Sequence, residues 1–337
     1  MTARSKNHDW LAQTVEDALE PGLPICDPHH HLWDQVTGRV AARYLIDEIA
    51  EDVNAGHNIV STVFIECGAM FKSDGPEALR PVGETEFVNG IAAMSASGLY
   101  GKTRIAAGII GTANLRLGDG AAAVLDAQIA AGGGRFRGIR LGAAWDPNDS
   151  VPSHRTRPGQ GLLLRDDFRK GFAHLAPRKL TFEAWLYHHQ IPDVTSLARA
   201  FPGTTIILNH FGGPLGIGPY AGRAKDIYVE WRKSISELAT CPNVVAQLGG
   251  INMEINGFGW HERSRPPGSQ ELCDATRHYY EFTIEQFGAD RCMFESNFPV
   301  DKASCSYTVL WNSFKRLTKG SSATERAKLF HDTAARV

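Results

Sequence analysis

Eight short apolar runs recur along the chain, and segments with helical spacing of apolar residues separate each run from the next. Several runs, such as 59–67 and 104–110, are almost continuously apolar, as expected of strands that are buried on both faces. Strands that alternate with helices predict a parallel sheet. The eight runs are residues 25–32, 59–67, 104–110, 136–141, 180–187, 204–210, 243–248 and 291–295.

Eight strand–helix units in 337 residues predict a closed (β/α)8 barrel, the TIM barrel, of the α/β class. The alternative is an open doubly wound sheet, but neither a Gly-x-Gly-x-x-Gly nor a Walker pattern follows the first run. No proline- or serine-rich linker divides the chain, so we expect residues 23–337 to form a single barrel domain. Residues 1–22 are then a short N-terminal extension. Its apolar residues at helical spacing are Trp10, Leu11, Val15 and Leu19.

The segments between the runs predict helices, and the terminal helix carries a start signal. Ser322 followed by Glu325 is a capping box, in which each side chain binds a backbone amide at the beginning of a helix. The other predicted helices span residues 44–53, 84–97, 118–131, 162–175, 193–201, 223–240, 269–287 and 303–317.

The composition restricts the function classes. Apolar residues make up 43 % of the chain, which is enough for a large core, and the net charge of −2 argues against nucleic acid or an anionic membrane surface as a partner. The six cysteines are scattered without Cys-x-x-Cys spacing, so we expect them to be reduced packing residues. No apolar leader or membrane-length apolar stretch is present. We therefore expect a soluble cytoplasmic protein.

The first run contains three histidines and two carboxylates within the ten residues 25–34. Alternate residues of a strand share a face, so Asp27, His29 and His31 are predicted to point one way and His30 the other. Two imidazoles about 7 Å apart along a strand can converge on one ion or one substrate oxygen. Histidines can also be ordinary core residues. Whether these histidines belong to a functional site therefore depends on which residues lie at the other strand ends.

Polar residues gather at the C-terminal ends of the runs, where a (β/α)8 barrel keeps its active site. Each has an ordinary alternative: His210 could cap a helix, and Arg140 could pair with a structural acid. Together they predict a functional cluster at one mouth of the barrel. They are Asp27, His29 and His31, Glu66, Arg137 and Arg140, Tyr187, His188 and His189, Asn209 and His210, Gln247, and Glu295 and Asn297 with Asp301 just beyond.

Three of these motifs resemble those of the amidohydrolase superfamily. They are Asp27-x-His29-x-His31, the tetrapeptide His-Phe-Gly-Gly at 210–213, and Met-Phe-Glu-Ser-Asn-Phe-Pro-Val-Asp at 293–301. The chain is most similar to the branch that contains 2-pyrone-4,6-dicarboxylate lactonase, L-fuconolactonase and sulfomuconolactone hydrolase, from about residue 24 onward. The resemblance implies a (β/α)8 barrel that hydrolyses lactones or related small carboxylated molecules. It also implies one divalent metal ion, zinc before others, on His29, His31 and His210.

The chain departs from this pattern at the expected general base. The family places an aspartate after the eighth strand, but Asn297 occupies that position here and cannot accept a proton. Two acids lie near enough to replace it. Glu295 shares the inward face with Asn297 and lies about 7 Å deeper, and Asp301 follows in the next loop. The fourth strand ends in Arg137 and Arg140 rather than lysine, so the resemblance does not extend to a carbamylated-lysine binuclear centre.

Three hypotheses follow. The first is a lactone or ester hydrolase of the EC 3.1.1 type, with or without a metal, in which Glu295, Asp301, Asn297 and His210 are the catalytic candidates. The second is a metal-dependent decarboxylase of an aromatic or enoic acid, and the third, suggested by Asn297, is a ligand-binding barrel without turnover. The substrate is expected to be small and anionic. The sequence allows a homo-oligomer but does not predict the oligomeric state. The predicted substrate-binding residues are Arg140, Arg137, Tyr187, His188, Trp260 and His261, with the loops 142–161 and 249–268 over them.

Overall fold

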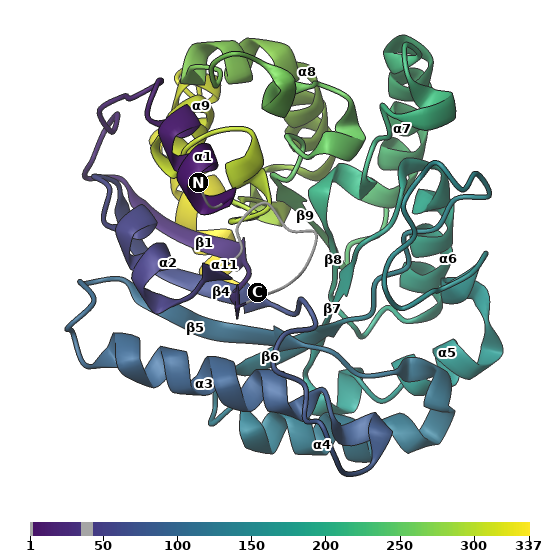
Figure 1. The fold of residues 1–337 in the computed structure, drawn as a ribbon. Coiled ribbons are helices and arrows are strands. Elements are labelled where there is room, and N and C mark those ends of the chain that lie inside the picture. The colour runs from purple at the N-terminus through teal and green to yellow at the C-terminus, as the bar shows by residue number, and fades with distance from the viewer. Residues whose placement is uncertain (1–2, 35–42) are drawn as a thin grey trace.

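Eight parallel strands follow one another around a nearly closed barrel in a computed structural model that describes residues 3–34 and 43–337 (Figure 1). Each strand pairs with the next in chain order, so the predicted (β/α)8 barrel is confirmed. All eight strands fall within or next to the predicted runs. They are β1 (Pro24–His30), β4 (Asn58–Ile65), β5 (Arg104–Gly111), β6 (Phe136–Arg140), β7 (Thr181–Ala184), β8 (Ile206–Leu208), β9 (Val244–Leu248) and β10 (Cys292–Phe294).

The barrel closes where the first strand meets the segment that follows the last. The backbone amide of His31 donates to the carbonyl of Phe298 at 2.8 Å, and the amide of Asn297 donates to the carbonyl of His29 at 2.9 Å. The carboxylate of Asp27 adds to this seam by accepting from the amide of Ser296 at 2.9 Å. The seam places the ends of β1 and β10 side by side.

Asp27 does not share a direction with His29, contrary to the prediction from strict alternation. Its other oxygen accepts from the hydroxyl of Tyr307 at 2.9 Å, on the outer side of the barrel. The pairing of β1 with β4 shifts register between Asp27 and His30, at Pro28, and this irregularity breaks the period of two. Asp27 is therefore part of the barrel seam, whereas His29 faces the interior.

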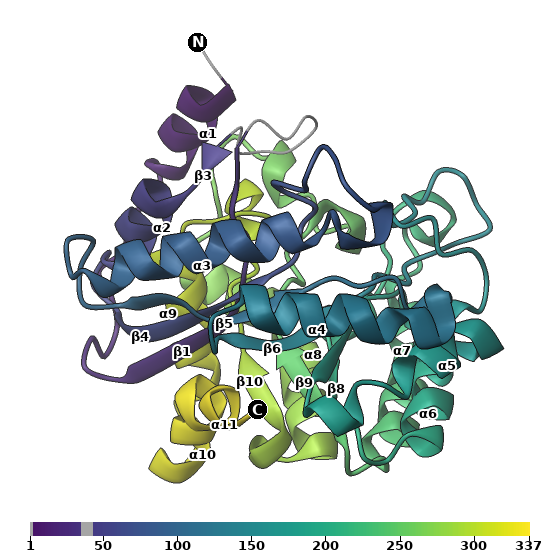
Figure 2. The ribbon, with the colours of Figure 1, turned by 90° about the horizontal axis from the view of Figure 1, so that it is seen from below.

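Helices surround the sheet, and α3 and α4 run alongside each other over β5 in the view of Figure 2. The predicted helix 162–175 is interrupted: a 3-10 turn at Leu162–Leu164 precedes a short α5. A small antiparallel pair of strands, β2 (Trp33–Asp34) and β3 (Arg43–Tyr44), lies outside the barrel. The helices are α1 (Ala3–Leu11), α2 (Ile46–Val53), α3 (Val82–Ala96), α4 (Ala121–Ala131), α5 (Asp166–Phe172), α6 (Ile191–Ala200), α7 (Ala224–Ala239), α8 (Ser269–Phe287), α9 (Tyr307–Leu317), α10 (Ala323–Ala327) and α11 (Thr333–Arg336).

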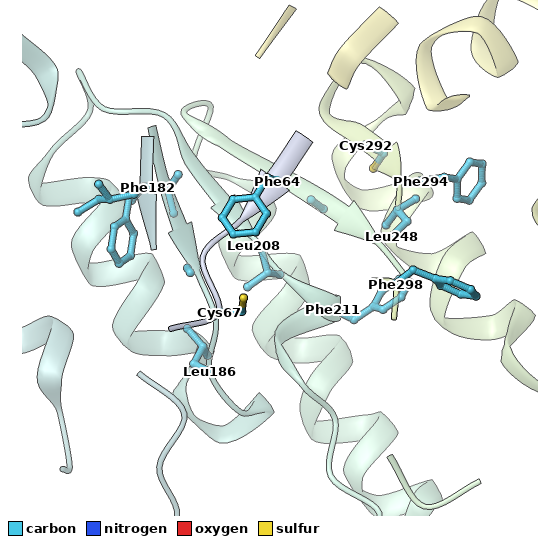
Figure 3. Packing of buried hydrophobic residues seen from close by; sticks show 14 of the residues in the cluster. Phe64, Cys67, Phe182, Leu186, Leu208, Phe211, Leu248, Cys292, Phe294 and Phe298 are labelled. Atoms are coloured by element: carbon cyan, nitrogen blue, oxygen red, sulfur yellow. The ribbon is translucent and has the colours of Figure 1, made fainter. Parts of the chain in front are cut away.

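The main core lies between the strands and the surrounding helices, where buried aromatic rings from both layers meet (Figure 3). Phe294 of β10 stacks on Phe314 of α9 with ring centroids 4.6 Å apart, and Phe182 of β7 packs against Phe172 of α5 at 5.2 Å. Each fully buried phenylalanine contributes roughly 1.5–3 kcal/mol to the free energy of unfolding. The outward face of the strands therefore fixes the barrel and leaves the strand ends for other roles.

The two ends of the barrel are covered differently. At the N-terminal ends of the strands, Ala334 and Val337 pack against a small cluster formed by Ile207, Val245 and Met293. The C-terminus accordingly lies inside the ring of strands in Figure 1. Only the opposite end, where the strands finish, is left for the long loops and the polar residues described below.

The N-terminal extension is attached to the last third of the chain. α1 ends at Leu11, before Val15, so the predicted helical spacing holds only in part. Trp10 donates from Nε1 to the carbonyl of Arg263 at 2.9 Å, and the carboxylate of Glu16 accepts from the amide of Ser269 at 2.7 Å. All six cysteines are buried and free, as expected. No helix within the described ranges is both long and apolar enough to cross a bilayer.

Candidate functional site

A single buried carboxylate connects two histidines from different strands, His29 of β1 and His210 after β8. Glu295, which follows β10, has Oε1 at 2.7 Å from Nδ1 of His210 and Oε2 at 2.7 Å from Nδ1 of His29. The two imidazole centroids are 4.5 Å apart. Burial alone would raise the pKa of Glu295, but the two facing imidazoles, His210 first and then His29, outweigh it and lower that pKa to about 2. Glu295 is therefore a carboxylate that holds two rings.

His29 and His31 bring two imidazole nitrogens together. Nδ1 of His31 lies 2.8 Å from the carbonyl of Ile65, which can only accept, so this nitrogen carries the ring proton. Nδ1 of His29 likewise faces acceptors, namely Glu295 and the Oε1 of Gln247 at 3.0 Å. Burial lowers the pKa of His29 to about 4, so the ring is neutral at pH 7. Both Nε2 atoms then present lone pairs, and they are 3.3 Å apart.

Two facing lone pairs repel each other unless a cation or a donor lies between them. Nη1 of Arg140 approaches Nε2 of His29 to 3.4 Å and is one such donor. Two ligands on a tetrahedral zinc ion, each about 2.1 Å from the metal, are about 3.4 Å apart. The separation of His29 Nε2 and His31 Nε2 therefore fits one divalent ion, with Ile65 and Glu295 as the partners that orient the two rings.

Distance alone also groups His29, His210 and Glu295, whose ligand atoms lie within 4.8 Å of one another. In this group both histidines direct Nδ1 to the carboxylate, which hydrogen bonding already explains. Between His29 and His31, by contrast, it is the two Nε2 atoms that approach each other, at 3.3 Å. We therefore regard the two Nε2 atoms of His29 and His31 as the better ligands for a cation. The group of His29, His210 and Glu295 lies next to them.

Glycines after β9 make the position of His210 possible. His210 and Phe211 have φ values of 51° and 58°, and Gly212 and Gly213 continue this left-handed turn. A Cβ on Gly250 would lie 2.1 Å from Nδ1 of His210, and a Cβ on Gly249 would lie 2.4 Å from Cγ of Glu295. The absence of side chains at Gly249 and Gly250 is therefore required for the His210–Glu295 contact.

A buried polar network supports His29 from below. Gln247 Oε1 faces Nδ1 of His29 and also accepts from Nδ2 of Asn209 at 2.6 Å. The same amide of Asn209 donates to Glu183. Burial raises the pKa of Glu183 to about 8. These strand residues fix the amide of Gln247 and thereby the orientation of the His29 ring.

Arg140 and Arg155 bind the same carboxylate at the mouth of the barrel. Arg140 donates from Nε to Oε1 of Glu66 at 2.8 Å and from Nη2 to the Glu66 carbonyl at 2.6 Å. Arg155, from the loop after β6, pairs with the other oxygen of Glu66. Arg140 thus forms an ion pair with a protein carboxylate, which was the structural alternative to a role in substrate binding. Its Nη1 nevertheless also approaches Nε2 of His29.

A cavity of about 370 Å³ opens at this mouth. It brings together side chains from the ends of six strands, β1, β4, β6, β7, β8 and β10, and from the loops after β6 and β9. Trp185 forms part of its wall and packs perpendicular to His210, with ring centroids 4.8 Å apart. The lining residues are His31, Cys67, Arg140, Ala144, Pro152, Ser153, His154, Arg155, Trp185, Tyr187, His210, Met253, Ile255, Asn297 and Val300.

The structure brings some of the predicted site residues to this cavity and places others elsewhere. Those in its wall are His31, His210, Arg140, Tyr187 and Asn297, with His29 and Glu295 directly behind them. Those outside the wall are Arg137, His188, Trp260, His261 and Asp301. Trp185 and Arg155 line the cavity without having been predicted as site residues, although Trp185 lies at a strand end and Arg155 in a predicted covering loop.

The residues outside the wall have structural surroundings of their own. Arg137 lies three residues before Arg140, about 10 Å further from the mouth, and donates to the carbonyl of Gly134 at 2.8 Å. His188 packs against the ring of Tyr220. Trp260 stacks on Phe258 with centroids 5.7 Å apart, and His261 lies 3.9 Å from Glu254 and from Glu262.

Asp301 lies behind Asn297 and does not line the cavity. Nδ2 of Asn297 donates to Oδ1 of Asp301 at 3.0 Å, and Asn297 itself has a left-handed φ of 54°. Burial raises the pKa of Asp301 to about 8. An acid in this place supports the asparagine amide from behind the cavity wall.

The raised pKa of Asp301 predicts a pH-dependent difference in stability. The folded protein holds this proton up to about pH 8, whereas the unfolded chain loses it near pH 3.8, so ionisation at higher pH destabilises the fold. We expect Asp301→Asn to gain about 1 kcal/mol of unfolding free energy relative to the wild type between pH 7 and pH 8. Urea denaturation at the two pH values tests this. A constant difference would mean that Asp301 is ionised throughout.

Comparison with known proteins identifies the family. The amidohydrolase family model matches residues 26–337. An uncharacterised protein of Sinorhizobium fredii is 33% identical over 331 residues, which cover 93% of this chain and 97% of that protein. An L-fucono-1,5-lactonase of Burkholderia multivorans is 28% identical over 171 residues, covering 50% of this chain and 55% of the lactonase.

Solved structures agree in fold. A Burkholderia multivorans amidohydrolase crystallised with bound zinc superposes with a TM-score of 0.69 at 23% identity, covering 93% of this chain and 98% of that chain. A 5-carboxyvanillate decarboxylase of Novosphingobium aromaticivorans, complexed with manganese, superposes at 0.56 with 12% identity, covering 96% of this chain and 98% of that one. Such neighbours support the barrel alone. The match of the family model over almost the whole barrel shows that the chain belongs to the amidohydrolase family.

Proposed function

We propose that this protein is a hydrolase that opens a lactone, or a related ester, of a small carboxylated molecule. The observation that carries the proposal is the Glu295–His210 pair, in which His210 lines the cavity together with Arg140 and Glu295 lies directly behind it. A carboxylate that holds Nδ1–H of an imidazole leaves Nε2 to take a proton from water. The L-fucono-1,5-lactonases among the relatives support the same reaction class, a carboxylic-ester hydrolase.

In this proposal His210 replaces the missing aspartate as general base. His210 removes a proton from water while the water oxygen attacks the carbonyl carbon, and Glu295 stabilises the imidazolium that forms. The ring carbon–oxygen bond then breaks, and the imidazolium returns the proton to the leaving oxygen. Ring opening of a lactone thus gives a hydroxy acid without any change of redox state.

Neighbouring residues would position the two reactants. Nδ2 of Asn297 is engaged by Asp301, so its Oδ1 is the atom that would accept a hydrogen bond from the attacking water. Arg140, whose Nη1 points toward His29, would bind the carbonyl oxygen or a carboxylate of the substrate. Asn297 orients water in this scheme but does not take its proton, which agrees with amide chemistry.

One divalent metal ion fits the nitrogen pair of His29 and His31. Zinc is the first choice for neutral imidazole ligands, and a solved amidohydrolase of the same fold was crystallised with zinc. When bound, such an ion would polarise the carbonyl and lower the pKa of a water molecule to about 7. Ile65 and Glu295 would keep the two rings aligned for it.

A panel of sugar lactones and carboxylated lactones tests the proposal, with acid release followed by pH-stat titration and carbon dioxide measured in parallel. We expect acid release without carbon dioxide, and its loss in His210→Asn. The control is His261→Asn, which changes a histidine outside the cavity and should retain the rate. Carbon dioxide release from aromatic or enoic acids would favour a decarboxylase. Tight binding without turnover would favour a ligand-binding barrel.

A further inference from the structure

A second hollow lies on the other side of Arg155, and we call it the arginine groove. It has a volume of about 680 Å³, and its walls come from the segments that follow β4, β5 and β6. Among the residues that the structure describes, Arg155 alone lines both this groove and the active-site cavity. The groove is lined by Phe71, Glu77, Ala78, Arg80, Pro81, Thr112, Asn114, Arg116, Leu117, Leu141, Arg155 and Thr156.

The groove carries an excess of positive charge. Three arginines line it, Arg80, Arg116 and Arg155, whereas Glu77 is the single carboxylate among the described lining residues. Within the described ranges, neither Arg80 nor Arg116 has a carboxylate oxygen within 4.0 Å, unlike Arg155, which pairs with Glu66. Two guanidinium groups next to the site are therefore not neutralised by a protein ion pair.

Arg116 is held in place rather than left to rotate. Oδ1 of Asn114 accepts from the backbone amide of Arg116 at 3.2 Å and from its Nε at 3.1 Å. This fixes the plane of the guanidinium and leaves its Nη edge to bind two oxygens of one anion. The nearby carboxylate of Asp167 is already bound by Arg165 at 2.6 Å. This hydrogen bond, with a smaller effect from the charge of Arg116, lowers the pKa of Asp167 to about 2.

Apolar side chains lie between the charged positions. Phe71 is 40% exposed and Leu117 is 42% exposed, which is high for side chains of this size, and both line the groove. Leu141 and Pro81 continue the apolar surface. Water-exposed apolar area next to fixed positive charge suits a ligand with an apolar segment that ends in an anionic group.

Arg155 connects the two spaces. It crosses over Gly68 to reach Glu66, and a Cβ on Gly68 would lie 2.7 Å from its Nε. We propose that the arginine groove binds a second anionic group of the substrate, carried on an apolar spacer that passes Arg155 from the active-site cavity. This inference rests on the proposed function, because it assumes that the reacting carbonyl lies beside His210. The substrate class is thus an elongated acid rather than a compact one.

The test measures binding and needs no turnover. Calorimetry with the straight-chain dicarboxylates glutarate, adipate, suberate and sebacate compares each with the monocarboxylate of the same chain length. We expect at least one dicarboxylate to bind about tenfold more tightly than its partner, and this preference to weaken as salt is raised. Equal binding throughout the series would overturn the proposal.

Paired variants locate the effect. In Arg80→Gln/Arg116→Gln the dicarboxylate preference should disappear. The matched control Arg199→Gln/Arg277→Gln removes the same charge from exposed arginines that pair with Glu237 and Glu281, and it should keep the preference. A preference that survives in the first double variant would contradict the groove. If the preference is found but no lactone is opened, only the proposed function fails; if lactones are opened without it, only the groove fails.

Discussion

Glu295→Gln is expected to lower kcat by about a thousandfold or more while the barrel stays folded. Oε1 of the carboxylate accepts from Nδ1 of His210, and Oε2 lies 2.7 Å from Nδ1 of His29. A glutamine has one acceptor oxygen, and its amino group would force one of the rings into the opposite tautomer. It also lacks the negative charge that stabilises an imidazolium at position 210. The measurement is kcat with a lactone identified in the panel, together with a circular dichroism spectrum of each variant.

Asp52→Asn is the matched control for this substitution. Asp52 is a carboxylate with an 11% exposed side chain and also has two partners, since it accepts from Nζ of Lys302 at 2.8 Å and from the hydroxyl of Tyr44 at 2.6 Å. It lies outside the cavity, so its loss should lower stability and leave kcat nearly unchanged. A Glu295→Gln enzyme within tenfold of the wild type would show that another group activates the water.

Gly250→Ala is expected to lower kcat by about a hundredfold, although residue 250 has no side chain that could take part in the reaction. The new Cβ would lie 2.1 Å from Nδ1 of His210, so the ring would have to leave its position beside Glu295. A displacement of about 1 Å at a catalytic group costs roughly two orders of magnitude in rate. Steady-state kinetics with the same lactone measures this loss.

Gly222→Ala separates this effect from backbone strain. Gly222 has a φ of 74°, close to the 65° of Gly250, but nothing lies within 4 Å of its added Cβ. Both variants should lose about 1–2 kcal/mol of unfolding free energy, because an alanine disfavours the left-handed region. Only Gly250→Ala should lose activity. Equal rates in the two variants would mean that His210 has room to adjust.

The barrel could be predicted from the sequence because each strand is an apolar run that needs burial on both faces. Strand lengths were less predictable. The run 204–210 contributes only Ile206–Leu208 to β8, since His210 begins a left-handed turn that apolar periodicity does not register. Likewise Asp27 left its expected face because the chain is irregular at Pro28, and a strict period of two cannot foresee such an irregularity.

The candidate site divides in the same way. His29, His31, His210 and Glu295 could be placed together because all follow parallel strands, whose ends meet at one mouth. The role of Glu295 could not be predicted, because a glutamate that acts as a base and a glutamate that orients histidines look identical in a sequence. The positions of loop residues were the hardest to predict from the sequence. Trp260 packs on Phe258 rather than over the cavity. Arg155 is held at the cavity by an ion pair with Glu66, which lies 89 residues earlier in the chain.

The seam between β1 and β10 has a consequence for the order in which the molecule can form. His29 and His31 leave the ribosome with the first strand, but Glu295 and the backbone of Phe298 emerge almost last. Until then β1 and β9 are both open edges, and each offers unpaired amides and carbonyls to any other strand nearby. The histidine pair therefore stays incomplete through most of synthesis, and the unfinished barrel is at its most aggregation-prone just before its final strand arrives.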